Sequence, residues 1–296
     1  MRWPGVEGIG ALKRSESMRE LKKALDGIEI ARPLNDPVQY VRRFGSREDA
    51  EIAGLLISSV AYGKIDHIMR DAQTLLDIVG NEPARFVASF TKVQARKFGG
   101  FKHRFTRGTH MACLVYRIKH ALSDHGSLHA LFQEGWADSL DTRTTTLHLV
   151  GKLRSYGCPG FCDDCANPRR QSVQYLLSEP RNGSAAKRIC LYLRWMVRDT
   201  YPDVGVWRGI PKSALVIPLD THVARLGRLL GLTARRSSDW STAVEITNAL
   251  KQLDPDDPVR YDYPLSHLGI DGNCVGKHSV ATCNVCRLRQ FCREAA

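Results

Sequence analysis

The chain of 296 residues has no apolar run close to the roughly 20 residues that a membrane-crossing helix needs, so we expect no transmembrane segment. It also has no internal repeat and no low-complexity tract, and the alternation typical of strands is almost absent. Residues 1–5 lead into a charged stretch and not into an apolar signal region. These absences argue against membrane, fibrous and repeat architectures, and they favour a globular protein of the cytoplasm.

What the chain does have is helical periodicity, with a hydrophobic content of 43% that is ample for a packed core. Residues 51–63 are apolar around most of a helix, which predicts a helix deep inside a bundle. Residues 68–79 predict a helix that ends at Gly80, a residue suited to a helix C-cap. The predicted fold class is therefore all-α. Further helices are predicted at 10–28, 110–122, 127–133, 184–197, 220–230 and 240–253, loops at 156–183 and 201–218, and coil after 253.

The charge of the chain is strongly positive. Lys and Arg together number 43 and Asp and Glu 31, which gives a formal net charge of +12. Such an excess favours a polyanionic partner such as nucleic acid, because each neutralised phosphate releases counterions and adds affinity. General solubility is the alternative explanation, since many basic proteins bind no nucleic acid.

Four of the nine cysteines gather near the C-terminus, as Cys274-x8-Cys283-x2-Cys286-x5-Cys292. Four thiolates so close in sequence can wrap a compact metal centre, and the C-x2-C pair lets two ligands leave one tight turn. Four thiolate ligands suit either zinc or an iron–sulfur cluster, so the spacing alone leaves both open. A chance grouping of structural cysteines is the third alternative. Basic side chains around this loop could contact phosphates or could be an ordinary solvated surface, namely Lys277, His278, Arg287, Arg289 and Arg293.

Three further cysteines, Cys158, Cys162 and Cys165, lie in a loop rich in proline and glycine. They could hold zinc with His148 or Cys190 as a fourth ligand, or they could be free thiols in an insertion.

Asp220 stands at the start of a predicted helix, in the string I-P-L-D-T-H-V-A-R-L. As an N-cap it satisfies free helix amides and gains from the positive end of the helix dipole, so we expect it to stay ionised. It could be no more than an ordinary cap. In a groove, however, a fixed carboxylate can also stabilise the positive charge that develops on a deoxyribose as its base departs, and can relay protons.

The string P-L-D-T-H-V-x-R-L followed by G-L, with the four cysteines after it, resembles the endonuclease III superfamily of helix–hairpin–helix DNA glycosylases. That resemblance implies an aspartate at a helix start followed by a [4Fe–4S] cluster held by Cys274, Cys283, Cys286 and Cys292. The x2 and x5 gaps match the family loop, whereas the x8 gap is longer. The glycine-rich hairpin that carries the family's nucleophilic lysine does not precede Asp220.

A better candidate for the nucleophile is Lys187, which lies 33 residues before Asp220 at the start of a predicted helix. In this respect the chain is similar to the archaeal 8-oxoguanine DNA glycosylases, whose Schiff-base lysine also opens a helix some thirty residues before the aspartate. The positive end of the helix dipole would favour the neutral, nucleophilic amine. A solvated lysine at a helix start is the simpler alternative.

The resemblance extends over roughly residues 30–296, to an uncharacterised bacterial family of the same superfamily. It implies two helical domains with a central cleft: residues 1–45 pack an N-terminal helix on the C-terminal domain, residues 46–215 form a six-helix domain, and residues 216–296 carry the metal loop. Double-stranded DNA would lie across the cleft of a monomer associated with the nucleoid, with the target base flipped out. Candidate DNA contacts are Arg225, Lys277, Arg287, Arg289 and Trp207, whereas Tyr62 and Trp195 are expected in the core.

The predicted function is a DNA base-excision glycosylase that acts on a damaged base, with oxidised bases as one class and with an associated lyase activity left open. Lys187 would be the nucleophile and Asp220 the charge-stabilising carboxylate. The alternative is a non-catalytic protein that keeps the glycosylase fold and binds DNA structures.

Overall fold

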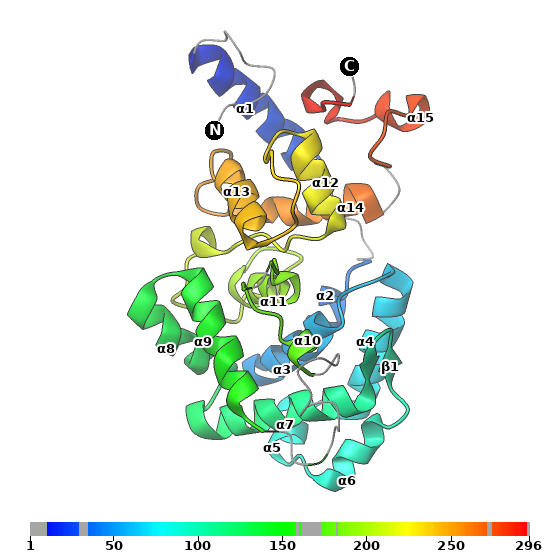
Figure 1. Cartoon of the computed structure of the whole chain (residues 1–296), viewed down its shortest axis with the longest axis vertical. Helices are drawn as coiled ribbons and strands as arrows, with labels where there is room; N and C mark the ends of the chain where they lie inside the picture. Colours follow the sequence, from blue (N-terminus) through cyan, green and yellow to red (C-terminus); the bar gives the residue numbers. More distant parts are fainter. Residues whose placement is uncertain are drawn as a thin grey trace. The chain divides into compact units, whose positions relative to one another are not determined.

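The computed structural model describes residues 11–29, 35–157, 160, 173–181, 183–270 and 274–294. Nearly all regular structure in this part of the chain is helical, as predicted, and the only described sheet has two strands of two residues each (Figure 1). No helix in the described residues is both long enough and apolar enough to span a bilayer. The chain divides into two compact units, which are described separately.

The larger unit comprises Pro33–Pro180 and Arg188–Ile210. Its described helices before the hairpin are α2 (Val38–Val41), α3 (Arg47–Ser59), α4 (Ile65–Val79), α5 (Pro83–Ala88), α6 (Lys92–Ala95) and the 3-10 turn η1 (Arg96–Phe98). The hairpin strands β1 (Lys102–His103) and β2 (Thr106–Arg107) precede α7 (Gly108–His125), α8 (Leu128–Ser139), α9 (Thr142–Ser155), α10 (Val173–Leu176) and α11 (Lys187–Val197).

The core of the larger unit is built around α3 and α11. Every residue of α3 from Ala50 to Ser59 is buried, which confirms the prediction that this segment lies deep in a bundle. The helix begins at Arg47 because the Ser46 hydroxyl accepts a hydrogen bond from the amide of Asp49. Gly54 allows α11 to come close, because a Cβ there would lie only 2.8 Å from Cε of Met196.

Helix α11 is buried on every side from Arg188 to Val197. Its charged residues are satisfied inside the unit. Asp203 is buried and accepts hydrogen bonds from both Arg194 and Arg198. Since charged groups are costly to bury unless they are paired, this ion-pair network is what allows Arg194 on the buried helix and Arg198 directly after it.

The smaller unit comprises Met1–Arg32, the short segment Arg181–Lys187 and Pro211–Ala296. The N-terminal helix α1 (Ala11–Asp26) therefore belongs with the C-terminal part of the chain, and its last residue, Asp26, forms an ion pair with Arg260 at 3.3 Å. The other described elements are η3 (Lys212–Ala214), α12 (Thr221–Leu229), α13 (Trp240–Leu250), η4 (Pro258–Tyr261), α14 (Asp262–Ile270), α15 (Val280–Cys283) and η5 (Arg289–Phe291). The sequence predicts the segments 1–45, 46–215 and 216–296. In the structure the larger unit begins at residue 33 and not at residue 46, and residues 181–187 join the smaller unit.

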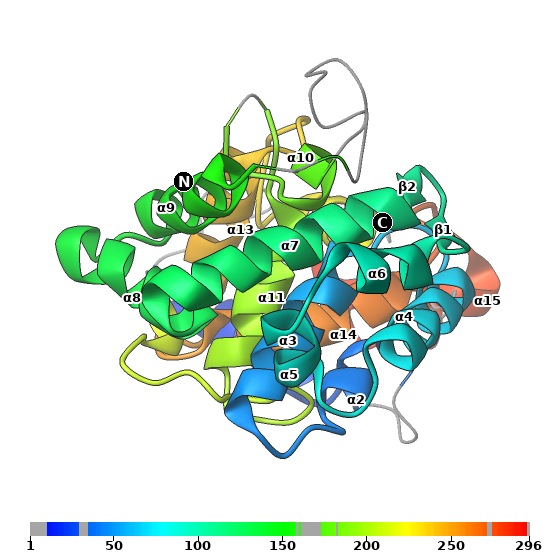
Figure 2. The same cartoon turned by 90° about the horizontal axis from the view of Figure 1, so that it is seen from below.

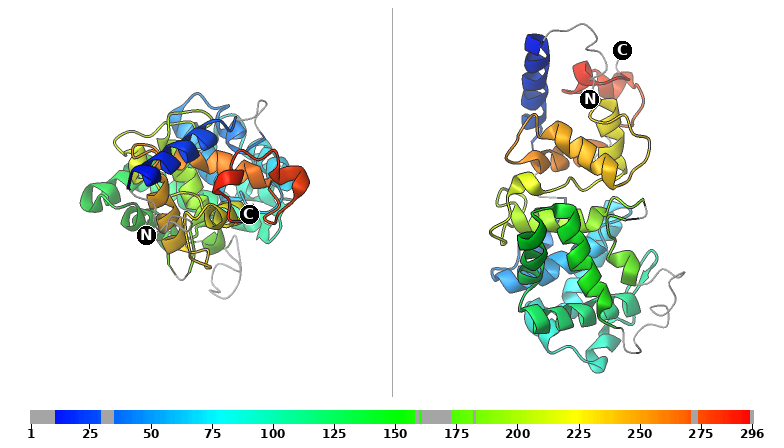
Figure 3. Two further views of the ribbon diagram at one scale, coloured as in Figure 1. Left: turned by 90° about the horizontal axis from the view of Figure 1, so that it is seen from above. Right: turned by 60° about the vertical axis from the view of Figure 1, so that its left-hand side comes forward.

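Residues 262–270 were predicted to be coil, and that prediction is wrong, because they form helix α14. This helix packs closely on α12. A Cβ on Gly269 would lie 2.2 Å from Nδ1 of His222, so only glycine fits at that crossing. The cysteine-bearing segment that follows α14 (red) lies beside α12 (yellow), and the amide of Arg293 donates to the carbonyl of Leu229 at 3.0 Å (Figure 3).

Candidate functional site

Asp220 is the N-cap of α12. One carboxylate oxygen, Oδ1, accepts hydrogen bonds from the amides of His222 at 2.9 Å and Val223 at 2.8 Å. Apolar residues of α12, including Val223 and Leu226, are buried and fix the helix in the smaller unit. Asp220 itself is half-buried, and Oδ2 accepts no hydrogen bond from the described residues. The carboxylate is thus held by one oxygen while the other remains available to a ligand.

Lys187 is the last residue of the segment Arg181–Lys187 and the first residue of α11. The turn before it is tight: Gly183 and Ala186 both have positive φ, of 79° and 50°. The predicted helix at 184–197 starts later than expected, because the Ser184 hydroxyl accepts from the amide of Ala186 within this turn and α11 begins only at Lys187. Lys187 is half-buried and belongs to the same unit as Asp220.

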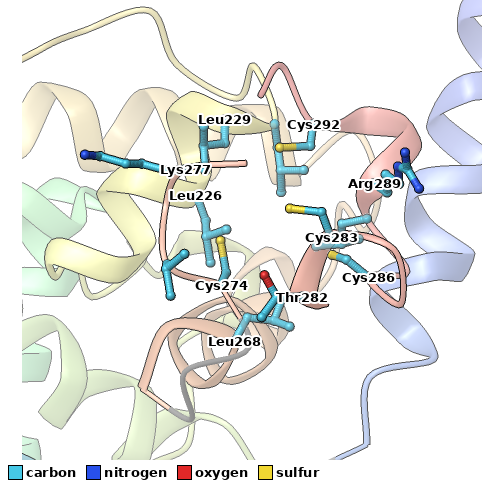
Figure 4. A pocket seen from close by; sticks show the side chains of 13 residues that line it. Leu226, Leu229, Leu268, Cys274, Lys277, Thr282, Cys283, Cys286, Arg289 and Cys292 are labelled. Carbon is cyan, nitrogen blue, oxygen red and sulfur yellow. The ribbon is translucent and has the colours of Figure 1, made fainter. Parts of the chain in front are cut away.

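The four C-terminal cysteines line one pocket of the smaller unit. The pocket encloses about 470 Å³, including the part open to solvent. In Figure 4 the sulfur atoms of the four cysteines surround a common space, with Leu226 and Leu229 of α12 on one side. Leu230, Leu268 and Leu288 add to its apolar lining. Residues from three separate stretches of sequence therefore build a single thiol-lined chamber.

Backbone hydrogen bonds hold the cysteine loop in shape. The amides of Cys283, Cys286 and Cys292 donate to carbonyls within the loop, and the amide of Ser279 donates to Sγ of Cys283 at 3.4 Å. Burial raises the pKa of the Cys292 thiol, and the nearby Cys274, Cys283 and Cys286 add to the rise. As the side chains stand, no three His, Cys, Asp or Glu residues in the described chain are grouped closely enough to hold a single metal ion.

Arg225 joins the cysteine loop to the Asp220 helix. Its guanidinium Nη2 donates to the carbonyl of Cys274 at 2.7 Å. The next residues of the loop wrap tightly over this side chain, because a Cβ on Gly276 would lie 2.5 Å from Cδ of Arg225, and Gly276 has a φ of 80°. We had expected Arg225 to contact DNA, and the structure engages it with the loop.

The outer face of the cysteine loop is basic. Lys277, Arg287 and Arg289 are exposed, and Nη1 of Arg289 donates to Oδ1 of Asn284 at 2.7 Å. Arg287 also reaches the end of α1, since a Cβ on Gly27 would lie 2.9 Å from its Nη1. These three candidate DNA contacts therefore belong to one loop.

The proposal of Trp207 as a DNA-stacking residue is wrong. Its side chain is only 1% exposed, and its indole Nε1 donates to the carboxylate of Glu51 at 2.9 Å. The ring also packs against His129 and Phe132. The glycines on either side of Trp207 suggested an exposed loop, but an indole N–H can be buried when a partner accepts its hydrogen bond. Trp195 is fully buried, as expected.

Cys158, Cys162 and Cys165 lie outside the described residues. Of the fourth ligands considered for them, Cys190 is buried in α11. His148 faces Glu134 of α8, with Nε2 at 3.7 Å from Oε2. Cys113 in α7 is disulfide-bonded.

Sequence comparison assigns most of the chain to one family. The profile of a family described as a protein of unknown function (DUF2400) matches residues 36–271, a span that contains Lys187 and Asp220 and ends just before Cys274. No curated protein and no solved structure shows a significant match.

Proposed function

The chain belongs to the DUF2400 family of unknown function, and from its own residues we propose that it is a DNA base-excision glycosylase with an associated lyase step. Its substrate would be a damaged base in double-stranded DNA, with oxidised bases the first class to test. The observation that carries the proposal is the bond between Arg225 and Cys274, because it joins a capped aspartate helix to a thiol-lined chamber. Lys187 belongs to the same compact unit.

The geometry of Asp220 suits a charge-stabilising role. Two backbone amides fix the carboxylate, so its orientation costs little to maintain when a substrate binds. Oδ2 would face the sugar and stabilise the positive charge that develops as the glycosidic bond breaks.

Lys187 would supply the nucleophile. Its neutral amine attacks C1′ of the deoxyribose, and the electron pair of the C1′–N bond leaves with the base, which takes up a proton. Asp220 accepts the proton that the attacking amine loses. The nitrogen lone pair then forms the C1′=N bond as the C1′–O4′ bond breaks, and O4′ takes up the proton that Asp220 carries. The product is a protonated Schiff base between C1′ and Lys187, which is the species that a lyase reaction requires.

The four cysteines would hold the metal centre, and their donor set and apolar surroundings fit one. Four thiolates can hold either zinc or an iron–sulfur cluster. The x2 and x5 gaps of the cysteine loop, which resemble those of the endonuclease III superfamily, favour a [4Fe–4S] cluster, with zinc as the alternative. When bound, such a centre would brace the loop and supply no chemistry at the sugar.

The basic face of the loop would contact the DNA backbone. Lys277, Arg287 and Arg289 are exposed there, and the net charge of +12 favours a polyanion. Binding should therefore weaken steeply as salt rises.

Borohydride trapping on lesion-bearing duplexes tests the proposed chemistry. The wild type should form a covalent adduct with at least one lesion, and Lys187→Ala should form none. Lys212→Ala, which changes another lysine of the same unit, is the matched control and should trap like the wild type. Absence of any wild-type adduct, or trapping by Lys187→Ala, would show that Lys187 is not the nucleophile.

The second candidate is a non-catalytic protein that binds DNA structures, which the basic loop supports equally well. It predicts salt-sensitive binding that is unchanged in Asp220→Asn, with no base release from oxidised, alkylated or deaminated substrates.

The identity of the metal is tested separately. Protein purified without oxygen should be brown if it holds iron and sulfur, and a colourless solution with stoichiometric zinc would overturn the cluster.

A further inference from the structure

The hairpin β1–β2 presents a two-residue turn, Arg104–Phe105, at the edge of the larger unit (Figure 2). In its register Lys102 pairs with Arg107 and His103 with Thr106. Phe105 is 52% exposed, and of the Phe, Trp and Tyr side chains in the described residues it is the only exposed one. An exposed aromatic ring offers an apolar face that can stack on another planar ring.

Hydrogen bonds anchor the hairpin to the rest of the larger unit. His103 is buried, and its ring nitrogens contact Oδ2 of Asp71 at 2.6 Å and the carbonyl of Tyr62 at 2.9 Å. The Tyr62 hydroxyl donates to the carbonyl of His103 at 3.0 Å and lies 2.8 Å from Oγ1 of Thr106. A two-stranded hairpin is only marginally stable on its own, and these hydrogen bonds hold it in place.

The turn itself is strained. Arg104 has a φ of 49°, in the left-handed region that non-glycine residues seldom adopt. Its side chain lies over Gly63, where a Cβ would be 3.0 Å from Cδ of Arg104, and its Cζ is 5.4 Å from the Phe105 ring centroid. Strain of this kind persists only where the surroundings impose it, and it is often found at functional sites.

The charge around the turn is of one sign. Residues 83–123 contain nine Lys and Arg and no Asp or Glu. Lys102, Arg104 and Arg107 of the hairpin are all exposed, so Phe105 stands among three cations. A nucleic-acid duplex offers both the phosphates that such cations bind and the stacked bases between which an apolar ring can insert.

We propose that the hairpin is a DNA wedge, in which Phe105 inserts between base steps while Lys102 and Arg107 hold the flanking phosphates. The proposal rests on the DNA binding of the proposed function, and adds a second contact surface, in the larger unit. A rigid wedge would offset part of the cost of unstacking a nucleotide.

The test uses the full chain and short duplexes that carry the fluorescent base 2-aminopurine, whose emission rises when it unstacks. Wild-type protein should bind at low salt and raise the emission. Phe105→Ala should bind about tenfold more weakly and lose most of the rise, as expected for one stacked aromatic. Phe105→Trp should keep both properties. Val93→Ala is the matched control, because it shortens another exposed apolar side chain of the same unit and should change neither.

Each other outcome decides against the wedge in a distinct way. If the wild type binds and Phe105→Ala matches it in affinity and emission, the wedge is wrong and the proposed function stands. If the wild type does not bind duplexes even at low salt, both fail. Binding of the wild type to anionic lipid vesicles that Phe105→Ala loses, without binding to DNA, would assign the hairpin to a membrane surface.

Discussion

Asp220 has a structural role that is separable from its proposed chemistry. Because its Oδ1 caps α12, Asp220→Ala should lower the free energy of unfolding by about 1 kcal/mol, as loss of an N-cap does. Asp220→Asn keeps a good cap and should cost only a few tenths of that, yet it should reduce base release at least about 100-fold, as loss of a fixed electrostatic partner does. Urea unfolding and single-turnover assays measure the two effects. If Asp220→Asn loses no more activity than its small loss of stability explains, the residue is only a cap.

Glu51 shows how a buried carboxyl couples folding to pH. It is 1% exposed, and burial raises its pKa above the ordinary 4.5, although hydrogen bonds from Arg47 and Trp207 lower it in part. As pH rises past 4.5, the unfolded chain loses this proton first. The contribution of Glu51 to stability therefore declines until the pH passes the folded pKa, and is constant above it.

Glu51→Gln provides the comparison, because glutamine does not ionise. The stability of the wild type minus that of Glu51→Gln should fall as pH rises from about 4.5 and then level off. Urea unfolding of both proteins across this pH range measures the difference. A difference that is flat or grows with pH would contradict the assignment of burial as the dominant cause.

At the scale of elements, the long apolar helices were predictable and the short or polar ones were not. The segments at α3 and α4 carried clear periodicity, and Gly80 ends α4 with a φ of 78°, as predicted. Helix α14 was missed because it follows a run of aspartates and prolines and contains Pro264 itself. The hairpin strands, of two residues each, are too short for an alternating pattern to appear.

The sequence also placed the candidate site better than the contacts around it. The capping role of Asp220 and the common location of the four cysteines followed from spacing and residue type. Trp207 and Arg225 did not, because burial and long-range hydrogen bonds depend on which segments pack together. The charge asymmetry of residues 83–123 was a readable signal for the hairpin, but only exposure singles out Phe105.

Substitution of glycine by alanine should have opposite effects on stability at two helical positions, Gly108 and Gly151. A Cβ on Gly108, at the start of α7, would lie 1.6 Å from the carbonyl oxygen of Phe98, so Gly108→Ala should cost about 3 kcal/mol by forcing the backbone apart. Gly151 in α9 has nothing within 4 Å, so Gly151→Ala should stabilise by about 0.5–1 kcal/mol through helix propensity. Denaturant unfolding of the two variants measures both effects. Stabilisation by Gly108→Ala would contradict the close packing at Gly108, and destabilisation by Gly151→Ala would contradict the open space at Gly151.

At the scale of the whole molecule, a structural metal should stabilise one unit more than the other. Cys283→Ser removes one proposed ligand, so amides of α12 and α14 should exchange faster with solvent, whereas those of α3 and α7 should not change. Hydrogen exchange read by mass spectrometry measures this. Val285→Ser is the control, because it alters an 81% exposed residue of the same loop. Unchanged exchange in Cys283→Ser would mean that the cysteines hold no structural metal.

Gly276 and Arg225 form a pair that evolution can alter only together. With a φ of 80° and an arginine methylene where its Cβ would stand, Gly276 tolerates no side chain while the guanidinium occupies its present place. Among relatives, we expect a lineage that gains a larger residue at 276 to shorten or lose the arginine at 225, and to hold the carbonyl at 274 by other means. Saturation mutagenesis of position 276 should accordingly yield suppressors at position 225 before any other site.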